Sequence, residues 1–217
     1  RCAGGNRILN GYMKPQDIEK RSFEIITAEL GERTFPAGIA EVVKRVIHTT
    51  ADFDYADSLA FSPDVIEKAK AALAAGATVV TDTNMALSGV SKVTLAKLGG
   101  KAVCLMADEQ VASEAKARGV TRAVVSMEHA AKFEGPLLFA IGNAPTALIR
   151  LHELIEEGIV APALVIGVPV GFVNVVKELF IGGDTPYIIA RGRKGGSNVA
   201  ASIVNALLYQ MVHREGF

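Results

Sequence analysis

Short apolar runs alternate with segments of helical pattern from residue 77 onward, and this alternation constrains the fold more than any other feature. Strands that are apolar along their whole length are typical of a parallel sheet that helices cover on both faces. With right-handed crossovers, the pattern predicts an α/β fold with a doubly wound parallel sheet. The predicted strands span residues 78–81, 102–106, 137–141, 163–168 and 187–190, and the predicted helices between them span residues 91–98, 108–118, 145–157 and 197–212.

The first quarter of the chain adds N-terminal helices in front of this sheet. Apolar residues recur at helical spacing over residues 14–30 and 36–48. A third helix is expected to begin at Ser62-Pro63-Asp64, as an N-cap residue followed by proline in the first turn, and to run to Gly76. The 217 residues contain no repeat or linker, so a single domain over residues 1–217 is predicted.

Charge and composition narrow the classes of partner. Lys and Arg number 23 and Asp and Glu number 23, whereas proteins that bind nucleic acid or anionic membranes usually carry a basic excess. No apolar stretch approaches the ~20 residues of a membrane span, and no signal sequence is evident at the N-terminus. We therefore expect a cytoplasmic protein that binds neither nucleic acid nor membrane. Cys2 and Cys104 are too few for a four-ligand zinc site, and no metal site is predicted.

Ligands of a doubly wound sheet bind at the carboxyl ends of its strands, and two of the loops that follow strands have features of an anion site. Asn143 can cap the helix that Pro145 begins, which would leave backbone N–H groups free at the positive helix end, but an ordinary capped turn fits equally well. The loop at residues 191–197 combines cations, glycines and a serine cap beyond what a turn requires. Neither loop is a standard nucleotide-binding motif, so we expect the anion to be a carboxylate.

Two titratable residues are candidates for proton transfer. His48 ends an apolar helix, where the charged form of the imidazole is favoured and can donate a proton near neutral pH. The alternative is that His48 only complements the charge of the helix end. Asp82 follows the strand at residues 78–81 and is either a functional acid or a loop cap. The sequence has no nucleophilic serine elbow and no Cys–His pairing.

Together, these segments resemble the precorrin-8X methylmutase family of cobalamin biosynthesis, also called cobalt-precorrin-8 methylmutase. The resemblance runs from about residue 12 to residue 208. The segments that carry it are IGNAPTAL at residues 141–148, GVPVGFV at 167–173, RGRKGGS at 191–197, Arg45-Val46-Ile47-His48, Phe61-Ser62-Pro63-Asp64, Ser22-Phe23 and Asp82 with Met85 and Gly89.

The resemblance implies a flavodoxin-like fold and a homodimer with active sites near the subunit interface. It implies an isomerase that needs no cofactor and moves a methyl group from carbon 11 to carbon 12 of a contracted tetrapyrrole, giving hydrogenobyrinate or cobyrinate. The family's catalytic acid corresponds to His48. The residues predicted to bind the corrinoid substrate are Ser22, Asp82, Gly142, Asn143, Gly171, Arg191, Arg193, Lys194, Gly195, Gly196 and Ser197.

Two other classes compete with this interpretation. One is a non-catalytic tetrapyrrole carrier on the same scaffold, and the other is a flavodoxin-like protein that binds phosphate or nucleotide. One departure from the family is visible: members usually carry Glu-Ser-Lys after the GVPVGFV segment, whereas here Val176 leads directly to Lys177-Glu178. The sequence leaves open whether the substrate contains cobalt.

Overall fold

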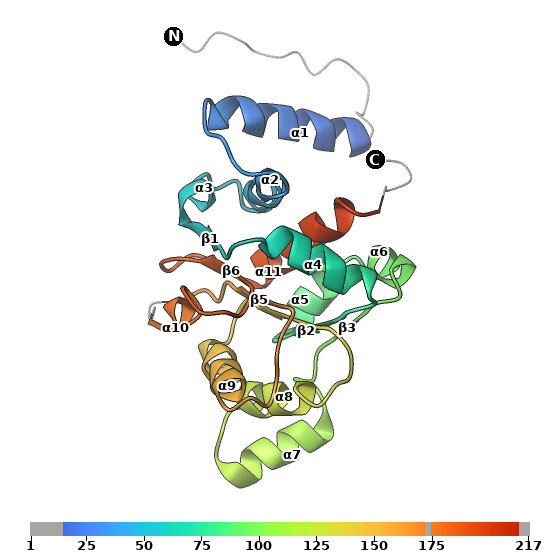
Figure 1. Cartoon of the computed structure of the whole chain (residues 1–217), viewed down its shortest axis with the longest axis vertical. Coiled ribbons are helices and arrows are strands. Elements are labelled where there is room, and N and C mark those ends of the chain that lie inside the picture. Colours follow the sequence, from blue (N-terminus) through green and yellow to red (C-terminus); the bar gives the residue numbers. More distant parts are fainter. Residues whose placement is uncertain (1–14, 172–174, 213–217) are drawn as a thin grey trace.

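The computed structural model describes residues 15–171 and 175–212 and contains one mixed sheet of six strands (Figure 1). Cys2, Phe172 and Val173, which entered the sequence analysis, lie outside these residues. The strand order is β1-β6-β5-β4-β2-β3. The strands are β1 (Leu59–Phe61), β2 (Thr78–Thr81), β3 (Lys101–Val103), β4 (Leu137–Ile141), β5 (Leu164–Gly167) and β6 (Tyr187–Ala190).

Strands β2 to β6 are parallel, but the prediction of a purely parallel sheet is wrong at one edge. Strand β1 pairs antiparallel with β6, with Leu59 opposite Ala190 and Phe61 opposite Ile188. Strand β1 was not predicted, because it is only three residues long and lies between two helical segments. The predicted strand at 102–106 also differs, since β3 begins at Lys101 and ends at Val103.

Eleven helices occur within the described part of the chain. Helices α5 and α8 and the four-residue helices α3 and α10 were not predicted, and the others overlap the helical segments of the sequence. Their bounds are α1 (Pro15–Leu30), α2 (Ile39–Thr50), α3 (Tyr55–Ser58), α4 (Val65–Ala74), α5 (Asn84–Gly89), α6 (Lys92–Lys97), α7 (Glu109–Arg118), α8 (Arg122–Ala130), α9 (Pro145–Glu156), α10 (Val175–Glu178) and α11 (Ser197–Tyr209).

The start of α4 differs from the predicted cap. Asp64 is the N-cap residue, with a left-handed φ of 56° and no side-chain cap bond. The Ser62 hydroxyl accepts a hydrogen bond from the backbone N–H of Tyr187 at 2.9 Å instead. Ser62 therefore ties the end of β1 to β6 rather than capping the helix.

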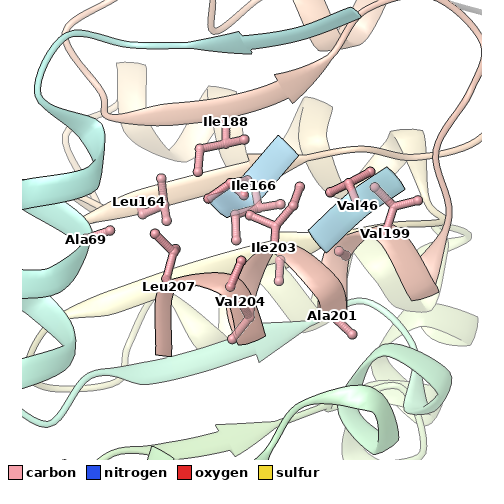
Figure 2. Packing of buried hydrophobic residues seen from close by; sticks show 14 of the residues in the cluster. Val46, Ala69, Leu164, Ile166, Ile188, Val199, Ala201, Ile203, Val204 and Leu207 are labelled. Atoms are coloured by element: carbon pink, nitrogen blue, oxygen red, sulfur yellow. The ribbon is translucent and has the colours of Figure 1, made fainter. Parts of the chain in front are cut away.

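Helices cover both faces of the sheet (Figure 1). Side chains alternate along each strand, so Leu164 and Ile166 of β5 pack with α2, α4 and α11, whereas Val165 packs with α8 and α9. Figure 2 shows Ile203 and Leu207 of α11 among these residues, and both are fully buried. Helix α1 packs on α2, so it lies one layer further from the sheet.

In the described part of the chain, no helix is both long and apolar enough to cross a membrane. Within the same residues, no group of three or more His, Cys, Asp or Glu side chains is arranged to hold a metal ion.

Candidate active site

His48 lies in the last turn of α2 and lines a cavity of about 290 Å³ between α1 and α2. Its ring is half-buried and stacks on Phe23 of α1, with the ring centroids 5.2 Å apart and the planes inclined by 20°. Stacking on one face fixes the ring orientation. Ser22 lines the same cavity, and its hydroxyl donates to the carbonyl of Ile18 at 2.8 Å. The remaining wall is largely apolar and comes from Ile25, Ile26, Glu29, Ile47, Ala51 and Phe53.

The surroundings of His48 disfavour its charged form. Burial lowers the pKa of His48 below its ordinary value of 6.5, and the positive charge of Arg45 lowers it further. The negative charge of Glu19 opposes them and raises the same pKa. Arg45 is ion-paired with Glu19, and its guanidinium carbon lies 4.6 Å from the Phe23 ring centroid. The predicted effect of the helix end, which favours the charged form, is therefore outweighed by burial.

Asp82 follows β2 directly and is almost completely buried, with an exposed fraction of 1%. Its carboxylate accepts three backbone hydrogen bonds, from the N–H of Gly142 at 2.9 Å, of Asn143 at 2.7 Å and of Ala144 at 2.6 Å. These groups lie at the N-terminus of α9, where a negative charge is favoured by the helix dipole. Asp82 thus binds the loop that follows β4.

This arrangement corrects one prediction. Asn143 does not cap α9, because the N-cap residue is Ala144 and no side chain makes a cap bond there. The N–H groups expected to be free are occupied by the chain's own carboxylate. The sequence did contain a signal, namely an acidic residue after one strand and a glycine before the helix that follows another. It could not show that these two segments contact each other.

The loops after β2, β4 and β6 meet at close range. A Cβ atom on Gly142 would lie 2.7 Å from the carbonyl oxygen of Gly196, so only glycine fits there. Ser197 is not the cap of α11, since Gly196 holds that position. Instead the Ser197 hydroxyl shares a 2.7 Å hydrogen bond with the Thr83 hydroxyl. Predicted binding residues from distant parts of the sequence therefore belong to one connected group of loops.

The loop at residues 191–197 also lies against the segment after β5. The N–H of Gly171 donates to the carbonyl of Arg193 at 3.1 Å, and the N–H of Gly196 donates to the carbonyl of Val168 at 2.8 Å. A Cβ atom on Gly195 would lie 2.0 Å from the Val168 oxygen, which requires glycine at this contact. The side chains of Arg191, Arg193 and Lys194 are exposed.

Lys194 joins this loop to the chain segment that follows His48. Its Nζ lies 2.6 Å from a carboxylate oxygen of Asp52 and 2.6 Å from one of Asp54. Hydrogen bonding to these carboxylates raises the pKa of Lys194 above its ordinary value, and the bond from Lys194 lowers the pKa of Asp52. Neither aspartate was predicted as a site residue, although Asp52 lies only two residues beyond the end of α2.

The comparisons with known proteins agree with the motifs. The family model for precorrin-8X methylmutase matches residues 17–210. The chain belongs to the precorrin-8X methylmutase family. The resemblance predicted from the sequence is thereby confirmed, and with it the prediction of an isomerase of cobalamin biosynthesis.

Relatives within the family are similar over nearly their whole length. The chain is 44% identical to the cobalt-precorrin-8 methylmutase of Priestia megaterium, over 90% of this chain and 88% of that protein. It is 46% identical to the cobalt-precorrin-8 methylmutase of Salmonella typhimurium, over 94% of this chain and 99% of that protein. The crystal structure of precorrin-8X methylmutase from Thermus thermophilus superimposes with a TM-score of 0.82 at 38% identity, covering 89% of this chain and 94% of that one.

Asp82→Asn tests whether this carboxylate holds the site loops of the methylmutase fold. The substitution replaces one acceptor oxygen by an amide that faces N–H donors, so the free energy of unfolding should fall by about 3 kcal/mol. Chemical denaturation measures the loss, and Asp184→Asn, at an exposed loop position, is the matched control. A loss below about 0.5 kcal/mol, the usual size for a surface substitution, would contradict the assigned role.

Arg45→Met tests the electrostatic control of His48. Removing the positive charge, while the negative charge of Glu19 remains, should raise the pKa of His48, because Arg45 lowers and Glu19 raises that pKa. Titration of the His48 ring by NMR measures the change. Glu19→Gln is the matched control with the opposite sign and should lower the pKa further. Shifts of the same sign in both variants would refute this account.

Proposed function

We propose that the chain catalyses the intramolecular methyl migration of precorrin-8X or cobalt-precorrin-8, with His48 as the proton donor. The observation that carries the proposal is the position of His48, at the end of α2 in a largely apolar cavity, in a chain of this family. The resemblance assigns the migration to carbons 11 and 12 of the ring. The direct test is incubation of the purified protein with metal-free and with cobalt-bound substrate while the visible spectrum is followed, which also decides which form is used.

Protonation and methyl transfer balance within the substrate. His48 gives a proton to the conjugated ring system, which becomes electron-poor, and the methyl group then moves with its bonding electron pair to the adjacent ring carbon. The ring then returns a proton to the neutral His48 imidazole, so the ring loses its added charge and His48 is protonated for another cycle. No electron leaves the substrate, so the reaction is an isomerisation. The protein has to hold the ring, supply the proton and stabilise the charge that develops.

A ligand with carboxylates helps His48 to perform this role. Burial and Arg45 keep the pKa of His48 low in the free protein, so a minority of molecules carry the proton at neutral pH. Carboxylates of a bound corrinoid would add negative charge near the site and favour the protonated imidazole. Substrate binding would then raise the protonated fraction of His48, and protonation of His48 would in turn strengthen substrate binding.

We propose that the loop at residues 191–197 binds peripheral carboxylates through Arg191 and Arg193. Both side chains are exposed on a loop whose backbone is fixed by contacts with the segment after β5. Lys194 would reach a ligand only by exchanging Asp52 or Asp54 for a substrate carboxylate. Asn143 would contribute its exposed side chain, and Ser22 would contact the ring beside His48. Asp82, Gly142, Gly171, Gly195, Gly196 and Ser197 would shape these loops.

The finer features of the architecture belong to the same proposal. The five parallel strands, numbered among themselves, follow the order two-one-three-four-five, which supports a flavodoxin-like sheet. We propose one methylmutase domain over residues 1–217, located in the cytoplasm.

Ile18 and Ile25 of α1 are 50% and 44% exposed, which supports a homodimer whose interface lies beside the His48 cavity. Sedimentation at micromolar concentration tests the dimer.

No observation favours the alternative of a non-catalytic carrier, since the matched relatives are methylmutases. Nor does any favour a nucleotide-binding protein.

His48→Asn tests the proton donor. Loss of a positioned general acid should slow turnover by at least about 100-fold, while binding of hydrogenobyrinate persists because the proposed carboxylate contacts lie on other loops. Stopped-flow absorbance with saturating substrate measures the first quantity, and titration of product absorbance measures the second. His152→Asn, on α9, is the control. Turnover near the unmodified rate would show that His48 only terminates the helix, and the acid would then have to be another group.

Arg193→Ala tests the carboxylate loop. Loss of one charge-assisted contact should weaken hydrogenobyrinate binding by about 10- to 100-fold at fixed salt concentration. Arg122→Ala, an exposed arginine at the start of α8, is the control and should leave the affinity unchanged. If both variants bind the product equally well, Arg193 does not belong to the site.

A further inference from the structure

Lys177 is a buried cation for which the mechanism above has no use. It lies in α10 with an exposed fraction of 3%. Its neighbours Val176 and Phe180 are buried in the core beneath α9, so the helix backbone that carries Lys177 is anchored. Among the described residues, no Asp or Glu forms an ion pair with Lys177, and burial lowers its pKa to about 8. It is therefore largely protonated at neutral pH.

The partners of the Lys177 ammonium are two backbone carbonyls of one loop. Its Nζ donates to the carbonyl of Gly192 at 3.1 Å and to the carbonyl of Lys194 at 2.9 Å. These two carbonyls flank Arg193 in the chain. The carbonyl of Arg193 itself accepts from the N–H of Gly171, so three successive carbonyls of this loop are held from outside it.

A lysine in this position is costly unless its contacts are needed. Removal of an ammonium group from water is compensated only in part by two neutral acceptors, and an ordinary turn closes without such a group. A charged donor forms stronger hydrogen bonds than a neutral one, and a buried donor makes them with little competition from water. The loop that receives these bonds consists largely of glycine and exposed cations, which by themselves favour many conformations.

We propose that Lys177 is a positioning residue, which fixes the backbone of the loop at residues 191–197 so that Arg193 meets a substrate carboxylate. This inference rests on the proposed function of that loop. Lys177 acts through the backbone and does not itself touch the substrate. It replaces loop flexibility by a preformed arrangement, so that less conformational entropy is lost when the ligand binds.

The test is a double-mutant cycle between Lys177→Met and Arg193→Ala, with hydrogenobyrinate as the probe. Methionine retains most of the apolar stem and loses the donors. Lys177→Met should weaken product binding by about tenfold and raise KM, while kcat at saturating substrate stays within about threefold. In the Lys177→Met background, Arg193→Ala should cost less than about threefold in affinity, since a mobile loop no longer presents the arginine.

Hydrogen exchange of the amides at residues 195–196 supplies a second readout. Exchange should accelerate in Lys177→Met and stay unchanged in Lys132→Met, an exposed lysine that serves as the control. Lys177→Arg, which retains charged donors, should preserve more of the product affinity than Lys177→Met. If Lys177→Met does not fold, Lys177→Gln takes its place, because the shorter amide cannot reach both carbonyls.

The outcomes separate this inference from the proposed function. If Arg193→Ala weakens binding but Lys177→Met changes neither affinity nor exchange, the inference is wrong and the loop's role stands. Faster exchange with unchanged affinity overturns it as well, because Lys177 would then be structural only. If Arg193→Ala has no effect in the unmodified protein, the proposed carboxylate loop is wrong, and with it the role of Lys177 in binding.

Discussion

The carboxylate of Asp82 joins two parts of this molecule that lie far apart in the sequence. It is buried at the end of β2 and accepts hydrogen bonds from backbone N–H groups that directly precede α9. The first of these groups, at Gly142, lies 60 residues further along the chain. A buried carboxylate is tolerated only when its oxygens are hydrogen-bonded, and three N–H donors at a helix N-terminus meet that demand. With the loop after β4 held in this way, Gly142 can approach the backbone of Gly196 at a distance that admits no side chain. The loops after β2, β4 and β6 therefore meet at this contact.

Electrostatic contacts also connect the loop at residues 191–197 to the segment that follows the helix carrying His48, the proposed acid. Lys194 reaches from the loop after β6 to Asp52 and Asp54, which follow the helix that carries His48. Arg45 and Glu19 act on His48 from the other side, with opposite effects on its pKa. Burial and the positive charge of Arg45 disfavour the protonated imidazole, so His48 is mostly neutral in the free protein at neutral pH. The carboxylates of a bound ligand would oppose this effect and favour the protonated imidazole when the substrate is present.

The sequence predicted the elements whose signals are local. Strands β4 and β6 were predicted with the bounds that they have, because each apolar run is enclosed by glycine, proline or charged residues. Strand β1 was missed because a three-residue edge strand depends on its partner β6 and not on its own pattern. His48, Arg193 and Lys194 could be selected as candidates from residue type and place.

Contacts within the site could not be predicted in the same way. Asn143 has the composition of a helix cap, but the distant Asp82 occupies the N–H groups that such a cap would serve. Ser62 was assigned to a helix start, whereas its hydroxyl accepts from the Tyr187 backbone across the edge of the sheet. Lys177 gives no sequence signal, since its acceptors are backbone carbonyls and any residue carries those. Such contacts are set by the tertiary fold, and one sequence alone does not determine which distant groups it brings together.

The proposed site has a cationic loop and a separate apolar cavity, and this separation explains how a chain with no net charge can bind an anionic macrocycle. Arg191, Arg193 and Lys194 lie on one loop at the strand ends, and several of the groups that orient this loop are uncharged backbone atoms. The cavity beside His48 is mostly apolar, which suits the ring of the substrate. A uniformly basic surface would bind carboxylates as well, but it would lower the pKa of His48 and leave the acid unprotonated. On the loop at residues 191–197, the charge of Lys194 is partly neutralised by Asp52 and Asp54, so this loop adds less net positive charge beside the helix that carries His48.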